Sequence, residues 1–372
     1  MRTHVIVNTT AKLYRTTPTA LGDLERASAG RAEIIATKTL SELDEACRRI
    51  AEQGTDCVAL SGGDGTFMAG LTALTGAFAE RARSGTGGFP RLALLPGGTV
   101  ATVARNWGST GPAPALLARL LRDGTGARVS PRPTLRVTDD AGSRVGFIFG
   151  TGLVARFFGV YYEAGAGGQA GAARIVARVF AESFYGGSYA RRVLDPLPCT
   201  IDVDGRRLVP EAWSLICCSV VRDVGLHLLV NHRAGEDFER PHLVASALSP
   251  TRLGPRMPYV LAGKSIGGEH HFDDLVRTFT VRFGNAGGPY VLDGDVFRST
   301  SVTVGAGPAI DVVRFGLPTK RVRAARLNDE LTGHLARSRK RAAASAAPRH
   351  FPGSSASCAC VTACRSVGSS FL

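Results

Sequence analysis

The stretch LSGGDGTF, residues 60–67, decides the fold of the first part of this chain. It follows an apolar run and precedes a helical pattern whose apolar face carries Phe67, Leu71, Leu74 and Phe78. A strand, a glycine loop and a helix N-terminus form an anion site, because glycine lets the backbone approach closely and first-turn N–H groups donate. A carboxylate at Asp64 would repel a bare phosphate, so the loop also implies a bridging cation or an incoming hydroxyl.

Strands alternate with helices on both sides of this loop. Residues 5–8 and 33–37 read as short strands, and a capping pattern at Thr39 and Glu42 opens the next helix. Residues 92–95 form a further strand. This alternation predicts a parallel sheet with right-handed crossovers, which binds its ligands at the carboxyl ends of the strands.

A second glycine loop, LPGGT at residues 95–99, follows that strand and precedes the helical pattern VATVARNW. Either loop alone is a weak signal, because turns use glycine routinely. Two such loops, both at strand-to-helix junctions, favour a nucleotide-phosphate site over ordinary turns.

The pattern changes after Pro131, where turns separate short strands. Candidate strands are residues 135–138, 144–149, 200–203, 213–221, 243–247, 278–283, 290–292, 301–304 and 310–314. This spacing is typical of an antiparallel sandwich or barrel. Residues 172–184 interrupt it with an amphipathic helix, which we expect to pack on the sandwich. The alternatives are a helix on a membrane surface or over a lipid pocket.

These patterns predict three segments. Residues 1–130 form a nucleotide-binding α/β domain, rejoined by about residues 305–335, and residues 131–304 form a β-sandwich substrate domain. Residues 336–372 are rich in Arg, Ala and Ser without apolar periodicity, so we expect a disordered basic tail.

The formal net charge of +14 is compatible with nucleic acid, an anionic membrane surface or a polyphosphate substrate. The sequence carries no zinc-finger spacing and no RNA-binding aromatic signature, which argues against nucleic acid. No apolar run approaches membrane-spanning length, and the N-terminus lacks the pattern of a signal peptide. We therefore expect a cytoplasmic protein.

The eight cysteines do not suggest a disulfide framework. We expect buried free thiols at five positions: Cys47, Cys57, Cys199, Cys217 and Cys218. The others that stand out, Cys358, Cys360 and Cys364, fall in the predicted tail. The pair His270 and His271 has no ligand partner at a convincing spacing, so we expect an exposed turn there and no metal site.

Three motifs in order, SGGDGT at 61–66, LPGGT at 95–99 and YVLDGD at 290–295, resemble the diacylglycerol kinase/sphingosine kinase catalytic family. The resemblance covers roughly residues 4–320. It implies a Rossmann-like nucleotide domain of the NAD-kinase/diacylglycerol-kinase type, followed by an antiparallel β-sandwich domain, with the active site in the cleft between them.

The resemblance also implies an ATP and Mg²⁺ site. Its nucleotide-binding residues would be Asn8, Thr37, Gly62, Gly63, Asp64, Gly65, Thr66, Gly97, Gly98 and Thr99. We expect Asp295 to be the catalytic base, with Asp293 and Asp64 organising the acceptor and Mg²⁺, Asp64 by way of the phosphates. Carboxylates at positions i and i+2 of a strand share a face, whereas a solvated Asp-Gly turn is the alternative.

Three departures from the family pattern stand out. The first loop, residues 8–12, reads NTTAK and lacks the usual Pro and Gly; Ala101 and Thr102 stand where the family carries Asn; and Asp295 replaces a Glu. These departures bear on nucleotide affinity and acceptor contacts.

The sequence thus predicts an ATP-dependent lipid kinase of phospholipid metabolism, transferring the γ-phosphate to a hydroxyl of diacylglycerol or a sphingoid-type lipid. The alternatives are an NAD-kinase-like enzyme with a soluble acceptor, or a catalytically impaired nucleotide- or lipid-binding protein. We expect peripheral association with an anionic membrane surface, no nucleic-acid partner and a possible homodimer.

Overall fold

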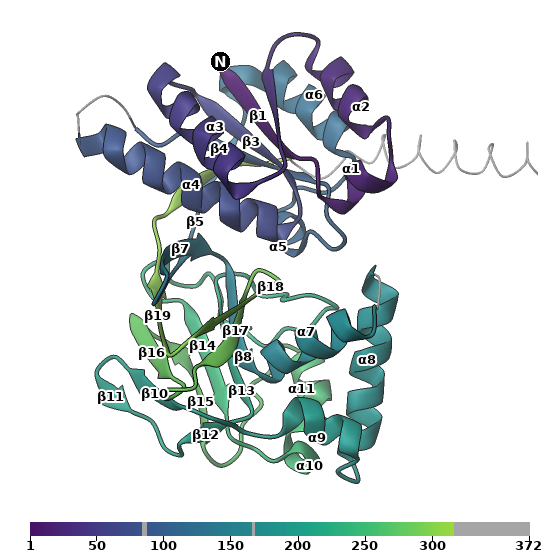
Figure 1. The fold of residues 1–372 in the computed structure, drawn as a ribbon, viewed down its shortest axis with the longest axis vertical. Coiled ribbons are helices and arrows are strands. Elements are labelled where there is room, and N and C mark those ends of the chain that lie inside the picture. Colours follow the sequence, from purple (N-terminus) through teal and green to yellow (C-terminus); the bar gives the residue numbers. More distant parts are fainter. Residues whose placement is uncertain (84–87, 166–167, 316–372) are drawn as a thin grey trace, which may run out of the picture. The chain divides into compact units, whose positions relative to one another are not determined.

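The computed structural model describes residues 1–83, 88–165 and 168–315 of the 372-residue chain (Figure 1). The predicted tail at residues 336–372, with Cys358, Cys360 and Cys364, lies outside the described residues.

A six-stranded sheet, here called the parallel sheet, organises the first part of the chain in the order β2-β1-β3-β4-β20-β5. Its strands are β1 (Thr3–Asn8), β2 (Glu33–Thr37), β3 (Cys57–Gly62), β4 (Arg91–Pro96), β5 (Val129–Arg132) and β20 (Ile310–Val313). The first four run parallel, β20 joins them in parallel beside β4, and β5 is antiparallel to β20. The chain therefore leaves this sheet after β5 and returns to it with β20.

Helices cover both faces of the parallel sheet, because its strands are apolar on both faces (Figure 1). The helices are α1 (Lys12–Thr16), α2 (Ala20–Ser28), α3 (Leu40–Gln53), α4 (Asp64–Arg83), α5 (Thr102–Asn106) and α6 (Ala113–Asp123), with a 3₁₀ turn at Gly124–Gly126. Val58 and Leu60 of β3 share a core with α3 and α4, whereas Cys57 and Ala59 share one with α2 and α6.

Local signals account for most of these helices. Thr39 caps α3 as predicted, with its Oγ1 accepting from the backbone N–H of Glu42 at 3.2 Å. Helix α1 was not predicted from the sequence. Its short length and absence of buried residues left no apolar periodicity to detect.

Two six-stranded antiparallel sheets form the second part of the chain, in the orders β11-β10-β16-β19-β6-β7 and β15-β14-β13-β8-β17-β18. The strands of the first are β6 (Leu135–Asp139), β7 (Gly142–Gly146), β10 (Thr200–Val203), β11 (Arg206–Arg207), β16 (Thr278–Arg282) and β19 (Ser301–Ala306). The strands of the second are β8 (Ile148–Gly152), β13 (Leu215–Ser219), β14 (His242–Ser246), β15 (His271–Leu275), β17 (Gly288–Leu292) and β18 (Asp295–Ser299). A short ladder joins β9 (Leu197–Pro198) to β12 (Ala212–Trp213).

The two sheets pack face to face. The rings of Phe149 on β8 and Phe279 on β16 lie 5.7 Å apart in one buried core. The predicted fold class, a parallel α/β part with an antiparallel sandwich, is therefore confirmed. The single strand predicted at residues 144–149 was wrong in one respect, because the chain passes from one sheet to the other between β7 and β8.

A group of helices packs against the second sheet: α7 (Leu153–Glu163), α8 (Gly168–Ser183), α9 (Ser188–Leu194), α10 (Pro250–Leu253), the 3₁₀ turn Gly254–Arg256 and α11 (Met257–Leu261). The predicted helix at 172–184 corresponds to α8, which buries Ile175 and Val179 in a shared apolar cluster with α9 and β13. The helix therefore packs into the fold mainly against the helices beside it, α9 above all, rather than directly on the strands of the sandwich.

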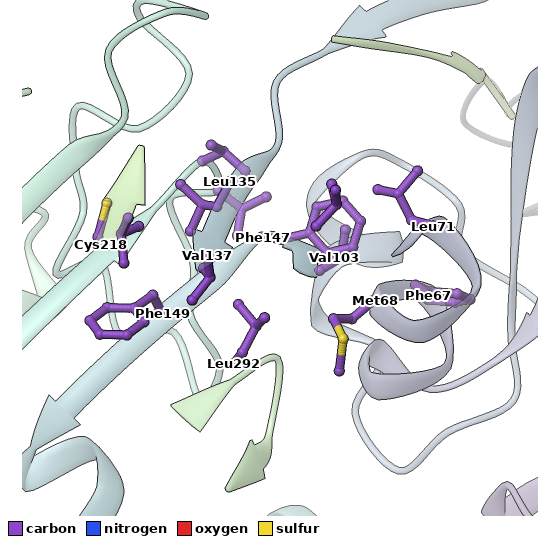
Figure 2. Close-up of a cluster of buried hydrophobic side chains, with 14 of the residues drawn as sticks. Phe67, Met68, Leu71, Val103, Leu135, Val137, Phe147, Phe149, Cys218 and Leu292 are labelled. Atoms are coloured by element: carbon purple, nitrogen blue, oxygen red, sulfur yellow. The ribbon is translucent and has the colours of Figure 1, made fainter. Parts of the chain in front are cut away.

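The core of the parallel part continues into the sandwich. Figure 2 shows a cluster of buried hydrophobic side chains. Phe67 and Met68 of α4 lie on the same side of this cluster as Val103 of α5, near Phe147. Thr72 of α4 accepts a hydrogen bond from the Val145 backbone at 2.9 Å, which ties α4 to β7. The long helix that follows the first glycine loop is thus held from both parts of the chain.

Two further sequence-based expectations can be checked directly. The five cysteines expected to be buried free thiols are so, and burial raises the pKa of Cys47, Cys57, Cys199 and Cys217 to about 12. Within the described ranges, no helix is long and apolar enough to cross a bilayer.

Candidate active site

The two glycine loops meet at the carboxyl edge of the parallel sheet. The backbone N–H of Gly97 donates to the Gly62 carbonyl at 2.7 Å. An added Cβ on Gly98 would overlap the Cα of Gly63, so these two backbones touch without room for a side chain. The predicted clustering of the loops is therefore observed, and glycine is required where they touch.

Several donors of these loops are not used by the protein. In the described parts of the chain, the backbone N–H groups of Gly63, Asp64, Gly65 and Thr66 have no acceptor, and the first loop-to-helix bond runs from Phe67 to Gly63. The N–H groups of Gly98 and Thr99 also have no acceptor there. Free donors at the N-terminus of a long helix beside a Cβ-free backbone fit the phosphates of a nucleotide.

Asn8 and Thr37, also predicted to bind nucleotide, lie at the ends of β1 and β2. The Asn8 amide donates to Thr66 Oγ1 at 2.9 Å and accepts from the backbone and the hydroxyl of Thr10, at 2.9 and 2.7 Å. Thr37 is buried, and its carbonyl accepts from the Thr9 backbone at 3.0 Å. Both residues therefore hold the first loop against the sheet and α4.

Asp64 caps a neighbouring helix. Its Oδ2 accepts from the Thr102 backbone at 2.8 Å, and its Oδ1 accepts from Val103 at 3.0 Å. The preceding residue, Ala101, has a left-handed backbone with φ of 49°, which turns the second loop into α5. Burial raises the pKa of Asp64, while the two N–H groups oppose that shift. Because each oxygen already accepts one N–H group, Asp64 joins the two loops.

Asp293 and Asp295 do not lie in one strand, so the prediction that they share a strand face was wrong. Asp293 and Gly294 have φ of 51° and 94° and form the hairpin turn between β17 and β18, with Leu292 paired to Asp295. Positive φ at both central residues is what a tight hairpin with right-handed twist requires. The turn at Asp293 is buried, unlike the solvated alternative.

The Asp293 carboxylate fixes the point where the chain changes sheets. Its Oδ2 accepts from the Phe147 backbone at 3.0 Å, and its Oδ1 accepts from Ile148 at 2.9 Å. Burial raises the pKa of Asp293 well above its usual range, and the nearby charge of Asp64 raises it further. Asp293 and Asp64 thus lie close together, each with both oxygens occupied by backbone donors.

Asp295 differs from both. Its side chain is exposed and, among residues 1–83, 88–165 and 168–315, has no hydrogen-bond or ion-pair partner. A Cβ on Gly65 would lie 2.7 Å from Asp295 Oδ2, so the carboxylate reaches the first turn of α4 because residue 65 is glycine. Desolvation by the surrounding protein raises the pKa of Asp295. The structure therefore places one free carboxylate beside the unpaired N–H groups of α4.

A mainly apolar cavity of about 510 Å³ opens next to these residues. Its lining includes Gly63 and Asp64 of the first glycine loop, Thr99 of the second, and Asp293 of the β17–β18 turn. Its apolar walls come from α7, α8, α11, strands β8 and β13, and the segment at residues 224–230. The volume is in the range of small-molecule sites. A ligand with a long apolar body can therefore place one end beside the glycine loops.

The sequence reasoning missed two features of this site. Helix α7 lines the cavity with four aromatic residues, Phe157, Phe158, Tyr161 and Tyr162, whose clustering in the sequence was the available signal. Lys12 was noted only as part of an unusual loop. A Cβ on Gly168 would lie 3.8 Å from its Nζ and 3.7 Å from Thr99, so this cation is near the second glycine loop.

The comparisons with known proteins agree with this geometry. Residues 2–130 match the family model of the diacylglycerol kinase catalytic domain. The resemblance to the diacylglycerol kinase family is confirmed. The matched residues include both glycine loops.

Solved structures share the fold at low sequence identity. A diacylglycerol kinase from Bacillus anthracis str. Sterne aligns with a TM-score of 0.54 and 14% identity, over 85% of this chain and 97% of that chain. A provisionally assigned diacylglycerol kinase from the same strain aligns with a TM-score of 0.59 and 16% identity, over 85% and 97% of the two chains. No curated protein sequence matches the chain.

Proposed function

We propose that this protein is an ATP-dependent lipid kinase that transfers the γ-phosphate of ATP to the hydroxyl of a diacylglycerol or sphingoid-type lipid. One observation carries the proposal. The free carboxylate of Asp295 lies beside Gly65, among the unpaired N–H donors at the N-terminus of α4, and the two residues before it, Asp293 and Gly294, line an apolar cavity.

Each part of this arrangement has a chemical role. The N–H groups of the two loops hold the phosphates, and Lys12 adds a positive charge near Thr99. Asp295 accepts the proton of the lipid hydroxyl. At the same time the hydroxyl oxygen forms the new bond to the γ-phosphorus, and the bond from that phosphorus to the leaving ADP oxygen breaks. Asp64 and Asp293 position these groups by fixing the backbones of α5 and β8.

Mg²⁺, when bound, neutralises charge on the phosphates. Asp295 is the acid of the three whose oxygens accept no hydrogen bond from the described residues, so it is the carboxylate best able to approach a phosphate-bound cation. Asp64, for which a link to Mg²⁺ was predicted, uses one lone pair of each oxygen to cap α5.

The cavity favours a lipid acceptor over a soluble one. Aliphatic and aromatic side chains dominate its walls, and burying acyl chain there gains about 0.8 kcal/mol per CH₂ group. A nucleotide-like acceptor would need many polar partners for its sugar and base, whereas these walls offer few, among them Gln169 and Arg256. This observation is the reason for preferring a lipid kinase to an NAD-kinase-like enzyme.

Peripheral membrane binding is part of the proposal. The turn after α8 exposes Phe184 and Tyr185, at 59% and 72%, and α8 itself exposes Arg174 and Arg178. Exposed aromatic and basic side chains together suit the interface of an anionic bilayer. A lipid drawn from that surface would reach the cavity lined by the same helix.

The direct test is transfer of label from γ-labelled ATP. We expect label in the lipid fraction when the protein is incubated with Mg²⁺ and vesicles of total lipid extract, and none with NAD as acceptor. Transfer to the soluble acceptor alone would replace the proposal with the NAD-kinase-like reading. ATP binding without transfer to any lipid in a broad panel would support an impaired binding protein.

Filling the cavity tests the lipid site. We expect Ala172→Trp to raise KM for long-chain diacylglycerol by at least about tenfold, because a large side chain there displaces acyl chain worth several CH₂ groups. KM for ATP should change little. Ala173→Trp, on the exposed face of the same helix turn, is the matched control. Equal KM values for the two variants would show that the acceptor binds elsewhere.

The raised pKa of Asp295 predicts a pH dependence. A base must be deprotonated, so we expect kcat to fall on acidification with a midpoint above about pH 4, the ordinary range of aspartate. The measurement is kcat at saturating substrates across the pH range in which circular dichroism shows an intact fold. A midpoint at or below the ordinary aspartate value would contradict the desolvated base.

A further inference from the structure

A second group of chemically active side chains lies on the outer strands of the second sheet. His242 begins β14, Asp273 lies in the adjacent strand β15, and His232 belongs to the long segment between β13 and β14. The sequence predicted an exposed turn without a metal site at His270 and His271. His270 is indeed exposed in a positive-φ turn, but His271 is largely buried next to Asp273, so half of that prediction was wrong.

The geometry brings three ligand-bearing residues together. His232, His242 and Asp273 each offer one ligand atom, and these atoms all lie within 4.8 Å of one another. The two imidazole rings are 5.0 Å apart and nearly perpendicular, at 83°. His242 Nε2 lies 2.7 Å from Asp273 Oδ1, and the His242 side chain is fully buried.

Buried ring nitrogens at this place have no partner. Within the described ranges, Nδ1 of His232, Nδ1 of His242 and Nδ1 of His271 are buried without a hydrogen bond. Leaving one buried polar atom unsatisfied costs about 1–3 kcal/mol, and native proteins rarely leave several together. With its hydrogen on Nδ1, His242 turns the lone pair of Nε2 toward Asp273 Oδ1, so the imidazole and the carboxylate can bind one cation between them. Some further group is needed to satisfy these nitrogens.

We propose that His232, His242 and Asp273 bind a divalent transition-metal ion, Zn²⁺ in the first instance. Two imidazoles and a carboxylate form a donor set that suits Zn²⁺, whereas Mg²⁺ and Ca²⁺ prefer oxygen alone. Three protein ligands leave a fourth position for water. Around them, Ser265 and His271 lie 3.1 Å apart, and His271 Nε2 is 3.4 Å from Asp273 Oδ2, so both can orient the carboxylate.

The ion would fix one wall of the lipid cavity. The segment that carries His232 also supplies Val224, Leu228 and Val230 to that wall. It is already tied to the sheet by Asn231, whose amide donates to the carbonyls of Cys217 and His242 at 3.2 and 2.8 Å. A metal that joins His232 to β14 and β15 would add a strong link at His232, the residue after Asn231. None of the three ligand residues lines the cavity, so the role we assign to the ion is to hold this wall in place.

Metal binding by the full-length chain tests this inference without reference to kinase activity. The protein is stripped with chelator and titrated with ZnCl₂ and, separately, CoCl₂, and bound metal and the visible Co²⁺ spectrum are recorded. We expect the wild type to bind Zn²⁺ and to show the d–d bands of low-coordinate Co²⁺. His232→Gln should lower the affinity by at least about tenfold and abolish those bands.

His270→Gln is the matched control, because this neighbouring imidazole is 49% exposed and lies outside the ligand group. Since Cys358, Cys360 and Cys364 can also bind Zn²⁺, the decisive quantity is the difference between the two variants. Equal binding by His232→Gln and His270→Gln, or no Co²⁺ bands in the wild type, would overturn the proposal. Matching metal-free melting curves of wild type and His232→Gln would show that lost binding does not come from misfolding.

Discussion

Asp295→Asn is expected to lower kcat for lipid phosphorylation by about 10²- to 10⁴-fold, the contribution of a positioned general base. The amide keeps the size of the side chain but cannot accept the hydroxyl proton. Asp295 has no hydrogen-bond partner among the described residues, so the change breaks no contact that holds the fold. The measurement is initial-rate transfer from labelled ATP, with KM for both substrates.

The matched control for this prediction is Asp311→Asn, the same change at an exposed carboxylate of β20. It should leave kcat within about twofold, as a surface substitution away from the site does. If Asp295→Asn changed KM for ATP at unchanged kcat, Asp295 would be a binding residue and the base would have to be sought elsewhere. The acid limb of the pH profile should also disappear in the variant.

Gly98→Ala is expected to weaken ATP binding by at least about tenfold, because its Cβ would overlap the Cα of Gly63. Neither backbone can move freely, since Gly97 donates to Gly62 and Asp64 joins the first loop to α5. The loops must therefore separate, and the donors that face the phosphates separate with them. Such overpacking also costs about 1–3 kcal/mol of stability. Calorimetric titration with ATP and a denaturation curve measure the two effects.

Gly76→Ala supplies the control for the glycine substitution. Gly76 lies within α4 with open space around the added Cβ, so alanine should stabilise the helix by roughly 0.5–1 kcal/mol and leave ATP affinity unchanged. Normal ATP affinity in Gly98→Ala would show that the contact between the loops does not form the nucleotide site. Loss of affinity in both variants would point to α4 as a whole.

These experiments address a site of which the sequence indicated a part. Both glycine loops and their place at strand ends followed from local patterns, since strand, glycine and helix signals lie within a few residues of each other. The choice of Asp293 and Asp295 followed from the resemblance of residues 290–295 to the family motif, and that of Asp64 from its place in the first glycine loop. The different environments of the three acids did not follow from the sequence.

The structural role of Asp64 and Asp293 depends on residues far along the chain. Asp64 accepts from the N-terminus of α5, and Asp293 accepts from the junction of β7 and β8. No local pattern specifies such partners, because a side chain finds them only after the sheets have packed. The same holds for the cavity, whose walls come from helices and strands separated by long stretches of sequence.

The place of the glycine loop at residues 60–67, between a strand and a helix N-terminus, was thus determined by the sequence, because backbone freedom and helix polarity are local properties. Tertiary structure alone decided which acid stays free beside it. Two carboxylates are held by backbone N–H groups brought from elsewhere, and Asp295 is left open next to Gly65. It also decided that His232, His242 and Asp273 converge, since distant segments meet only through the pairing of β14 with β15 and the packing of the loop on them.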